Sequence, residues 1–248
     1  MREIKLTKFC AILSIVNLVC FNIPFLRYAW DNADNSWYLC ACLAVLLLVL
    51  NFWACYLVCF LLRRFGRVLA ALCHFISTGC VYYIFAYNVM MDESMIGNFF
   101  NTRYEEASQF ITFPFIACLL IVGVLPMVWI IGAKVRYGSW KRLGITTAAS
   151  LGAALLIILG NLNQTLWIGN HDTELGGLVM PWSYVVNTCR LFGHQHERNR
   201  EETPLPDASF SNNERRAVVL VIGESARKAN CSLYGYERDT NPLLGAMD

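Results

Sequence analysis

The chain has 248 residues, of which 56% are hydrophobic and 15% are charged, and its formal net charge is +2. A composition this apolar and this poor in charge excludes an ordinary soluble domain and is typical of a membrane protein. The small net charge gives no reason to expect a nucleic-acid partner, so membrane lipids are the expected surroundings.

Five apolar stretches are each long enough to cross a bilayer, which takes about 20 apolar residues. They cover residues 9–26, 37–62, 68–91, 110–133 and 143–161. We therefore predict a membrane α-helical bundle of five transmembrane helices over residues 1–161. Basic residues precede the first stretch, as in a signal peptide, but Asn22, Pro24 and Phe25 occupy the place of a small-residue cleavage site. We interpret this stretch as a signal anchor.

Basic residues are concentrated in alternate connections between these stretches. The groups are Arg2, Lys5 and Lys8; Arg63, Arg64 and Arg67; and Lys134, Arg136, Lys141 and Arg142. The other connections are mainly acidic, with Arg27 and Arg103 as their basic residues. Because connections rich in lysine and arginine stay in the cytoplasm, the N-terminus is predicted to be cytoplasmic. Five crossings then place the chain after about residue 162 on the outer side.

Asn98, Thr102 and Glu106 lie four residues apart in the stretch NFFNTRYEE, between the third and fourth apolar stretches. On one continuous helix, this spacing would place the three side chains on one face. Such a face could hold an amine and a phosphate at the membrane surface, or it could simply be a hydrated helix face. From the spacing alone, the hydrated helix face is the preferred interpretation.

Most of the eleven cysteines lie in or next to the apolar stretches, where cysteine behaves as a small hydrophobic residue. Cys189 and Cys231 lie beyond them and either form a disulfide in an oxidising compartment or remain free thiols. His74 lies alone within a predicted span. Buried ionisable groups are often functional, but the sequence offers His74 no partner, and we interpret it as structural.

Residues 162–216 are predicted to be a linker that contains an interfacial helix. Four residues follow the i, i+3, i+4, i+7 pattern of a helix with one apolar face, namely Trp182, Val185, Val186 and Cys189. This helix is expected to lie on the membrane or against the bundle, and an ordinary surface helix is the alternative.

Residues 194–216 are polar and contain two prolines, so they are predicted to be an exposed connector. His194 and His196 have the spacing that a strand could use for a pair of metal ligands. In so polar a segment we expect both imidazoles to be solvated instead.

Residues 217–222 form a short apolar run that indicates a buried strand of a parallel sheet. Glu224 and Ser225 follow at its carboxyl end, which is where ligand-binding and catalytic residues lie in open α/β sheets. Ser225 could be a nucleophile, although Arg227 replaces the last glycine of the G-x-S-x-G pattern and no histidine follows it. Alternatively Glu224 binds a divalent metal and Ser225 caps the next helix, or Glu224 merely caps that helix or pairs with Arg227.

The segment around Glu224 resembles the start of the catalytic domain of phosphoethanolamine transferases, which belong to the sulfatase/alkaline phosphatase superfamily. The resemblance is strongest to the group that modifies lipid A. Its pattern, G-E-[ST]-x-R followed by G-Y-x-R-x-T-x-P, is matched here by Gly223, Glu224, Ser225 and Arg227, then Gly235, Tyr236, Arg238, Thr240 and Pro242. The five predicted spans agree with the same family. Residues 217–248 are accordingly expected to begin an α/β sulfatase-like periplasmic domain, beside a bundle in the bacterial inner membrane.

The resemblance implies transfer of phosphoethanolamine from phosphatidylethanolamine to a phosphate of lipid A, with zinc as cofactor. It makes Glu224 a zinc ligand. It also assigns Asn98, Thr102 and Glu106 to the pocket for the phosphoethanolamine donor, because the family carries N-x-x-x-T-x-x-x-E at this place.

In this family the nucleophilic threonine and the other metal ligands lie in later motifs, so the threonine is expected beyond Asp248. One strand with both edges open cannot bury a core, and the chain as written is expected to be an inactive fragment. A non-catalytic membrane remnant, or a phospholipid-binding protein, is the alternative.

Overall fold

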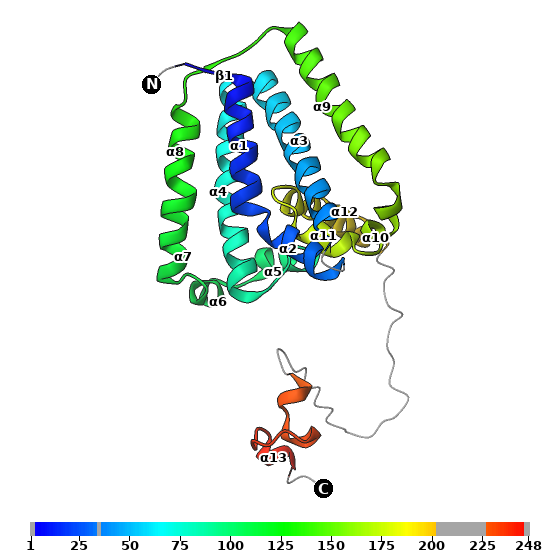
Figure 1. Cartoon of the computed structure of the whole chain (residues 1–248). Coiled ribbons are helices and arrows are strands. Elements are labelled where there is room, and N and C mark those ends of the chain that lie inside the picture. Colours follow the sequence, from blue (N-terminus) through cyan, green and yellow to red (C-terminus); the bar gives the residue numbers. More distant parts are fainter. Residues whose placement is uncertain (1–2, 34–35, 202–226, 246–248) are drawn as a thin grey trace. The chain divides into compact units, whose positions relative to one another are not determined.

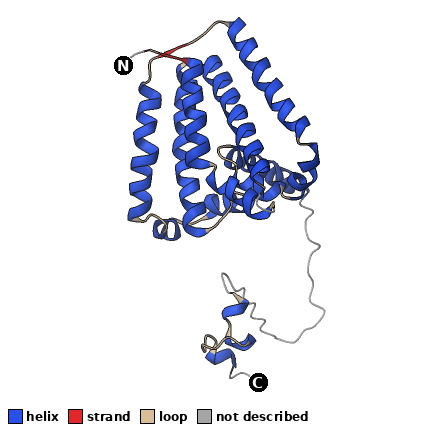
Figure 2. Cartoon of the chain, in the orientation of Figure 1, coloured by secondary structure: helices blue, strands red, loops and turns tan. Residues whose placement is uncertain are grey.

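The computed structural model describes residues 3–33, 36–201 and 227–245. The chain divides into two units, Met1–Glu202 and Thr203–Asp248, which are described separately. Nearly all of the described part is helical, and its strands are the two short segments drawn in red in Figure 2.

Long helices run side by side in the first unit (Figure 1). They are α1 (Leu6–Phe21), α3 (Trp37–Leu62), α4 (Arg64–Tyr87), the continuous segment α7 (Phe113–Cys118), η1 (Leu119–Val124) and α8 (Leu125–Gly132), and α9 (Trp140–Gly160). By length and composition, 4 of these helical segments could cross a membrane, or 5 if α1 and the bent helix that follows it form one span. The predicted helical bundle is therefore confirmed, with helix ends that differ by a few residues from the predicted ones.

The first predicted span, residues 9–26, is not one straight helix. It ends at Phe21, and α2 (Ile23–Asn32) continues at an angle of 56°. The 16 residues of α1 rise about 24 Å, which is less than the roughly 30 Å hydrocarbon core, so α1 alone is short for a span. Pro24 lies in the first turn of α2, where its missing N–H costs nothing, and this favours a new helix start after Asn22.

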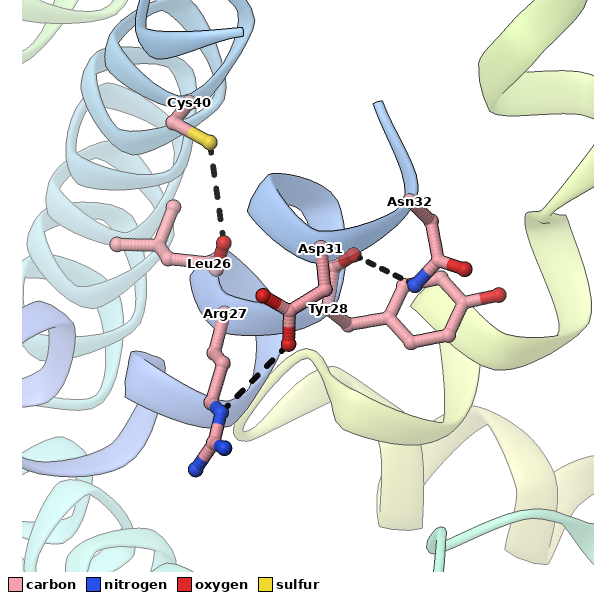
Figure 3. Close-up of polar contacts among 6 residues, drawn as sticks. All are labelled: Leu26, Arg27, Tyr28, Asp31, Asn32 and Cys40. Atoms are coloured by element: carbon pink, nitrogen blue, oxygen red, sulfur yellow. Dashed lines mark hydrogen bonds and ion pairs between the residues drawn. The ribbon is translucent and has the colours of Figure 1, made fainter. Parts of the chain in front are cut away.

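Polar groups of α2 are bonded largely within the helix itself (Figure 3). Arg27 and Asp31 form an exposed ion pair at 3.6 Å, and the Asn32 amide donates to the Tyr28 carbonyl at 2.9 Å. Toward α3, the Cys40 thiol lies 3.8 Å from the Leu26 carbonyl oxygen. α2 contacts the rest of the bundle through Phe25 and Ala29 in an apolar cluster, and the Trp167 indole donates to the Asn32 carbonyl at 3.1 Å.

The turn between α3 and α4 is tight. Arg63 joins the two helices with a positive φ of 53°, a conformation that L-residues rarely adopt. A Cβ atom at Gly66 would lie 2.6 Å from the Val58 carbonyl oxygen, so only glycine fits where α4 starts against the end of α3. The sequence at this turn therefore forces the two helices into an antiparallel pair.

The basic segments meet at one end of the bundle. β1 (Ile4–Lys5) pairs in parallel with β2 (Val135–Arg136), which ties the N-terminus to the segment before α9 (Figure 1). Arg67, from the start of α4, donates to the carbonyl oxygens of Ile131, at 3.1 Å, and Ala133. The three basic connections of the sequence are thus neighbours in space.

Short helices collect at the opposite end of the bundle (Figure 1). They are α2, α5 (Glu93–Asn101), α6 (Tyr104–Gln109), η2 (Leu162–Gln164), α10 (Thr165–Asn170) and α11 (Asp172–Leu178), and the longer α12 (Trp182–Glu201) lies at the same end. One hydrophobic cluster joins α2, α3, α4, α11 and α12 at this end, and a second cluster joins α1, α3, α4 and α8 at the basic end. The bundle therefore has a packed core near each end.

The helix predicted around Trp182 is confirmed as α12, with two corrections. It packs through Ser183, Tyr184, Asn187 and Leu191, which are all buried. The predicted apolar face is the more exposed one, with Trp182, Val185 and Val186 37–41% accessible. The helix also continues to Glu201, so the start of the predicted connector at residue 194 is helical.

Asn22 fixes the chain that leads into α12. Its amide nitrogen donates to the Met180 carbonyl at 3.1 Å, and its oxygen accepts from the Met180 N–H at 3.0 Å. Both residues are fully buried, so this pair of bonds replaces water for two backbone groups. The side chain at the break between α1 and α2 therefore holds a segment 158 residues away.

Residues 227–245, the described part of the second unit, contain three short helices, η3 (Lys228–Asn230), η4 (Ser232–Tyr234) and α13 (Pro242–Gly245). The Thr240 hydroxyl donates to the Asn230 carbonyl at 2.9 Å and accepts from the Ser232 N–H at 3.0 Å. Gly235 has a φ of +94°, which explains the glycine of the G-Y-x-R-x-T-x-P pattern. The predicted strand 217–222 lies outside the described residues.

Replacing Asn22 should loosen the start of α12. Asn22→Ala leaves the buried N–H and C=O of Met180 unpaired, at a cost of about 1–2 kcal/mol. Hydrogen exchange of the Met180 amide, measured in detergent by mass spectrometry, should accelerate about tenfold for a cost of this size. The control is Asn32→Ala, which removes an exposed amide bonded within α2. Equal exchange in both variants would contradict the role of Asn22.

Candidate functional site

Asn98, Thr102 and Glu106 do not lie on one continuous helix, which corrects the prediction. Asn98 belongs to α5, Thr102 is the residue after its last turn, and Glu106 belongs to α6. The Thr102 hydroxyl donates to the Asn98 carbonyl at 2.6 Å, and the Thr102 backbone, with ψ of 131°, leaves the helix. A threonine side chain that bonds a nearby carbonyl offers the backbone an alternative to continuing the helix.

The break leaves these three side chains with different bonding capacities. The Thr102 hydroxyl proton is already given to Asn98, so its oxygen is available only as an acceptor. The Glu106 carboxylate is an exposed acceptor, and the exposed Asn98 amide has both a donor and an acceptor. Acceptors from Thr102 and Glu106 suit a cation such as an ammonium group, while the Asn98 amide can donate to an anionic oxygen.

α12 packs beside α5 and supports this region. The Asn187 amide donates to the Met91 carbonyl at 2.8 Å, just before α5, and the rings of Phe100 and Phe192 lie 5.6 Å apart. His194 is exposed, as predicted, and its Nδ1 also lies 2.9 Å from a Glu93 carboxylate oxygen. The Asn98–Glu106 segment is therefore braced from α12.

A pocket of about 230 Å³ opens between α1, α3, α4 and the start of α12. Its polar wall is a chain of hydrogen bonds, in which the Asn51 amide donates to Asn17 Oδ1 and the Trp182 indole donates to Asn51 Oδ1, both at 2.8 Å. Sequence reasoning missed this group. The signal was present, because asparagines inside apolar spans need polar partners.

His74 also lines this pocket and is held by packing and one hydrogen bond. Its Nε2 lies 2.9 Å from the Val122 carbonyl oxygen, and its ring packs edge-on to Phe21 at 4.8 Å. The partner that the sequence did not show is therefore a backbone carbonyl. This environment agrees with the structural role predicted for His74.

The residues considered for metal binding have different outcomes. Glu224 and Ser225 lie outside the described residues, so their geometry stays a prediction. Cys189 and Cys231 are both free thiols, and the Cys231 thiol donates to Asn241 Oδ1 at 2.8 Å. Within the described part of the chain, one group of three metal-ligand side chains converges, consisting of Cys10, Cys55 and Cys59.

Comparison with known proteins gives one family for the chain. The family model described as phosphoethanolamine transferase EptA/EptB matches residues 46–196. The chain is 31% identical over 234 residues to phosphoethanolamine transferase EptA of Helicobacter pylori, covering 93% of this chain and 44% of that protein. It is 25% identical over 206 residues to the Kdo(2)-lipid A phosphoethanolamine 7''-transferase of Salmonella typhimurium, covering 73% of this chain and 37% of that protein.

A solved structure is similar in fold. It is the integral membrane protein lipooligosaccharide phosphoethanolamine transferase A of Neisseria meningitidis, at 24% identity and a TM-score of 0.79. The match covers 96% of this chain and 46% of that one, so the chain spans less than half the length of these relatives. Because the family model spans more than half of the chain, from α3 into α12, this protein belongs to the phosphoethanolamine transferase EptA/EptB family.

Proposed function

We propose that this chain acts in the transfer of phosphoethanolamine from phosphatidylethanolamine to lipid A. The observation that carries the proposal is the family match over residues 46–196, which includes all of α4, α5, α6 and α9. A relative named for lipid A supports the acceptor, and the membrane fold supports a donor taken from the bilayer. The activity is proposed for the whole protein to which these residues belong.

The donor headgroup is proposed to bind at Asn98, Thr102 and Glu106. Phosphoethanolamine carries an ammonium group and a phosphate. The Thr102 oxygen, whose own proton is given to Asn98, and the Glu106 carboxylate would accept from the ammonium. The Asn98 amide would donate to a phosphate oxygen. This division of roles follows from the hydrogen bond that the Thr102 hydroxyl donates to the Asn98 carbonyl, which leaves Thr102 an acceptor.

The headgroup proposal is tested by phosphatidylethanolamine binding to the purified protein in micelles, with phosphatidylglycerol as reference lipid. Glu106→Gln removes the charge that faces the ammonium and should weaken binding about fivefold, because an exposed charge pair is worth up to about 1 kcal/mol. Glu105→Gln is the matched control, since this neighbouring glutamate is also exposed in α6 and should leave affinity unchanged. Equal loss in both variants contradicts the assignment.

Transfer is tested separately, by mass spectrometry of lipid A from a bacterial host without its own phosphoethanolamine transferases. The protein with its full reading frame should add phosphoethanolamine to lipid A, and Glu106→Gln should reduce the modified fraction. Headgroup binding without any modified lipid A would contradict the transferase proposal and leave a phospholipid-binding protein.

Zinc is proposed as the cofactor, with Glu224 as one ligand. When bound, zinc would lower the pKa of a nucleophile and neutralise phosphoryl oxygens. Zinc sites use three or four protein ligands, and the family pattern assigns one in this chain, so no step of the transfer is derived through the metal.

The zinc assignment is tested by metal content rather than by activity. Glu224→Gln keeps the size of the side chain but loses the charge, and should lower bound zinc about tenfold or more. Ser225→Ala, which removes at most a helix cap, should keep wild-type zinc content. A wild-type protein without zinc, or undiminished zinc in Glu224→Gln, is the contrary result.

We also propose that the bundle lies in the bacterial inner membrane with its basic end in the cytoplasm. The support is the meeting of three basic connections at one end, through the β1–β2 pair and Arg67. With this orientation, α5, α6 and α12 lie on the periplasmic side, and the exposed apolar face of α12 is available to the membrane.

The orientation is tested with reporter fusions. A reporter joined after Arg67 should be cytoplasmic, because that position follows the basic connection between α3 and α4. A reporter joined after Arg200, at the end of α12, should be periplasmic. The same side for both positions would overturn the five-span topology.

A further inference from the structure

Three thiols from two helices converge inside the bundle. Cys10 lies on α1, and Cys55 and Cys59 lie on α3, with their sulfur atoms all within 4.8 Å of one another. The spacing of four residues puts Cys55 and Cys59 on the same face of α3, toward α1. Cys10 and Cys59 are fully buried, and Cys55 is partly accessible.

The group lies near the basic end of the bundle and is reached from the pocket. Cys10 is in the second turn of α1, and Cys59 is in the last turn of α3. Cys55 and Cys59 form part of the wall of the 230 Å³ pocket, so a small ion has room to approach the sulfur atoms. Cys73 of α4 lines the same pocket without belonging to the group.

The set of donor atoms selects a soft cation. Thiolates prefer copper(I), zinc and iron–sulfur clusters to hard cations such as magnesium or calcium. Three sulfurs bound at about 2.3 Å around one ion lie about 4 Å apart in a plane, which small rotations of the present side chains can reach. Structural zinc is almost always held by four ligands, whereas copper(I) is satisfied by three sulfurs, so three thiols favour copper(I).

The charge of such a site has a nearby partner. Sulfur atoms that bind a metal lose their protons, so an occupied site is anionic. The Arg67 guanidinium is near enough to Cys59 to interact with it electrostatically, and its Nε is buried without a hydrogen-bond partner. Burying an anionic cluster is costly unless opposite charge compensates it, and Arg67 offsets one of the two net negative charges of three thiolates around copper(I).

We propose that Cys10, Cys55 and Cys59 form a buried site for one copper(I) ion, which joins α1 to α3 at the basic end of the bundle. The site uses residues that the proposed transfer does not, so either proposal can fail without the other. Ordinary packing of cysteines as small hydrophobic residues is the competing explanation, and it predicts no preference of copper for these three thiols.

Copper content of the full chain tests the site. The reduced protein in detergent is given copper(I) without oxygen, and a competing copper(I) chelator then removes ions held by single thiols. The wild type should retain about one copper per chain, and Cys55→Ser should retain about tenfold less, because a serine hydroxyl is a poor ligand for a soft ion. Cys73→Ser is the matched control and should retain as much as the wild type. Equal copper in both variants overturns the site.

A second measurement needs no variant and so does not depend on folding of a mutant. Cys55 and Cys73 both line the pocket, and each can be alkylated by a small maleimide and quantified by peptide mass spectrometry. Copper(I) should slow alkylation of Cys55 about tenfold, since a metal-bound thiolate is not free to react, and leave Cys73 unchanged. No protection, or the same protection at both cysteines, rejects the proposal.

Discussion

Pairing of polar groups inside an apolar bundle is the constraint on which the arrangement of this protein depends. A buried amide or backbone group left unpaired in an apolar surrounding costs free energy, which favours arrangements that give it a partner within the protein. Asn22 binds both backbone groups of Met180, and Asn51 binds the Trp182 indole. These bonds attach the start of α12 to α1 and α3, and the Tyr184 hydroxyl adds a bond to the Cys73 carbonyl of α4.

The attachment of α12 explains how the candidate headgroup site is supported. α12 reaches α5 through Asn187, Phe192 and His194, and α5 and α6 carry the three candidate residues. The bonds at Asn22 and Asn51 are therefore connected to the site through one intervening helix, α12. Two helix breaks contribute to this arrangement. At the break between α1 and α2, the Asn22 side chain bonds Met180. At the break after α5, Glu106 is placed on a separate helix from Asn98.

The two ends of the bundle have different chemistry. At one end, short β pairing and Arg67 bring the basic segments together. At the other end, short helices, aromatic rings and acidic residues surround the candidate site. This polarity is the physical basis for the proposed orientation, because lysine and arginine are retained on the cytoplasmic side of a membrane.

The sequence by itself determined the helices and the family. Apolar length predicted the spans, and the 37–62 prediction coincides with α3, because backbone bonding in a membrane leaves a long apolar segment little choice but a helix. The motifs around Gly223 and Asn98 indicated the phosphoethanolamine transferases before any comparison. These features are readable because they depend on residues close together in the chain.

Only the tertiary structure decided which faces meet. A span that is apolar on all sides has no amphipathic pattern from which its packed face can be predicted. The local sequence therefore did not indicate that Cys10 would lie close to Cys55 and Cys59. The buried face of α12 was likewise set by partners distant in the sequence, not by its own apolar pattern: Tyr184 bonds a carbonyl 111 residues away and Asn187 one 96 residues away. α5 ends before Thr102 although the spacing suited a continuous helix, and the Thr102 hydroxyl bonds the Asn98 carbonyl at this end. Hydrogen bonds between residues far apart in the chain depend on how the helices pack. The periodicity of the sequence does not predict that packing.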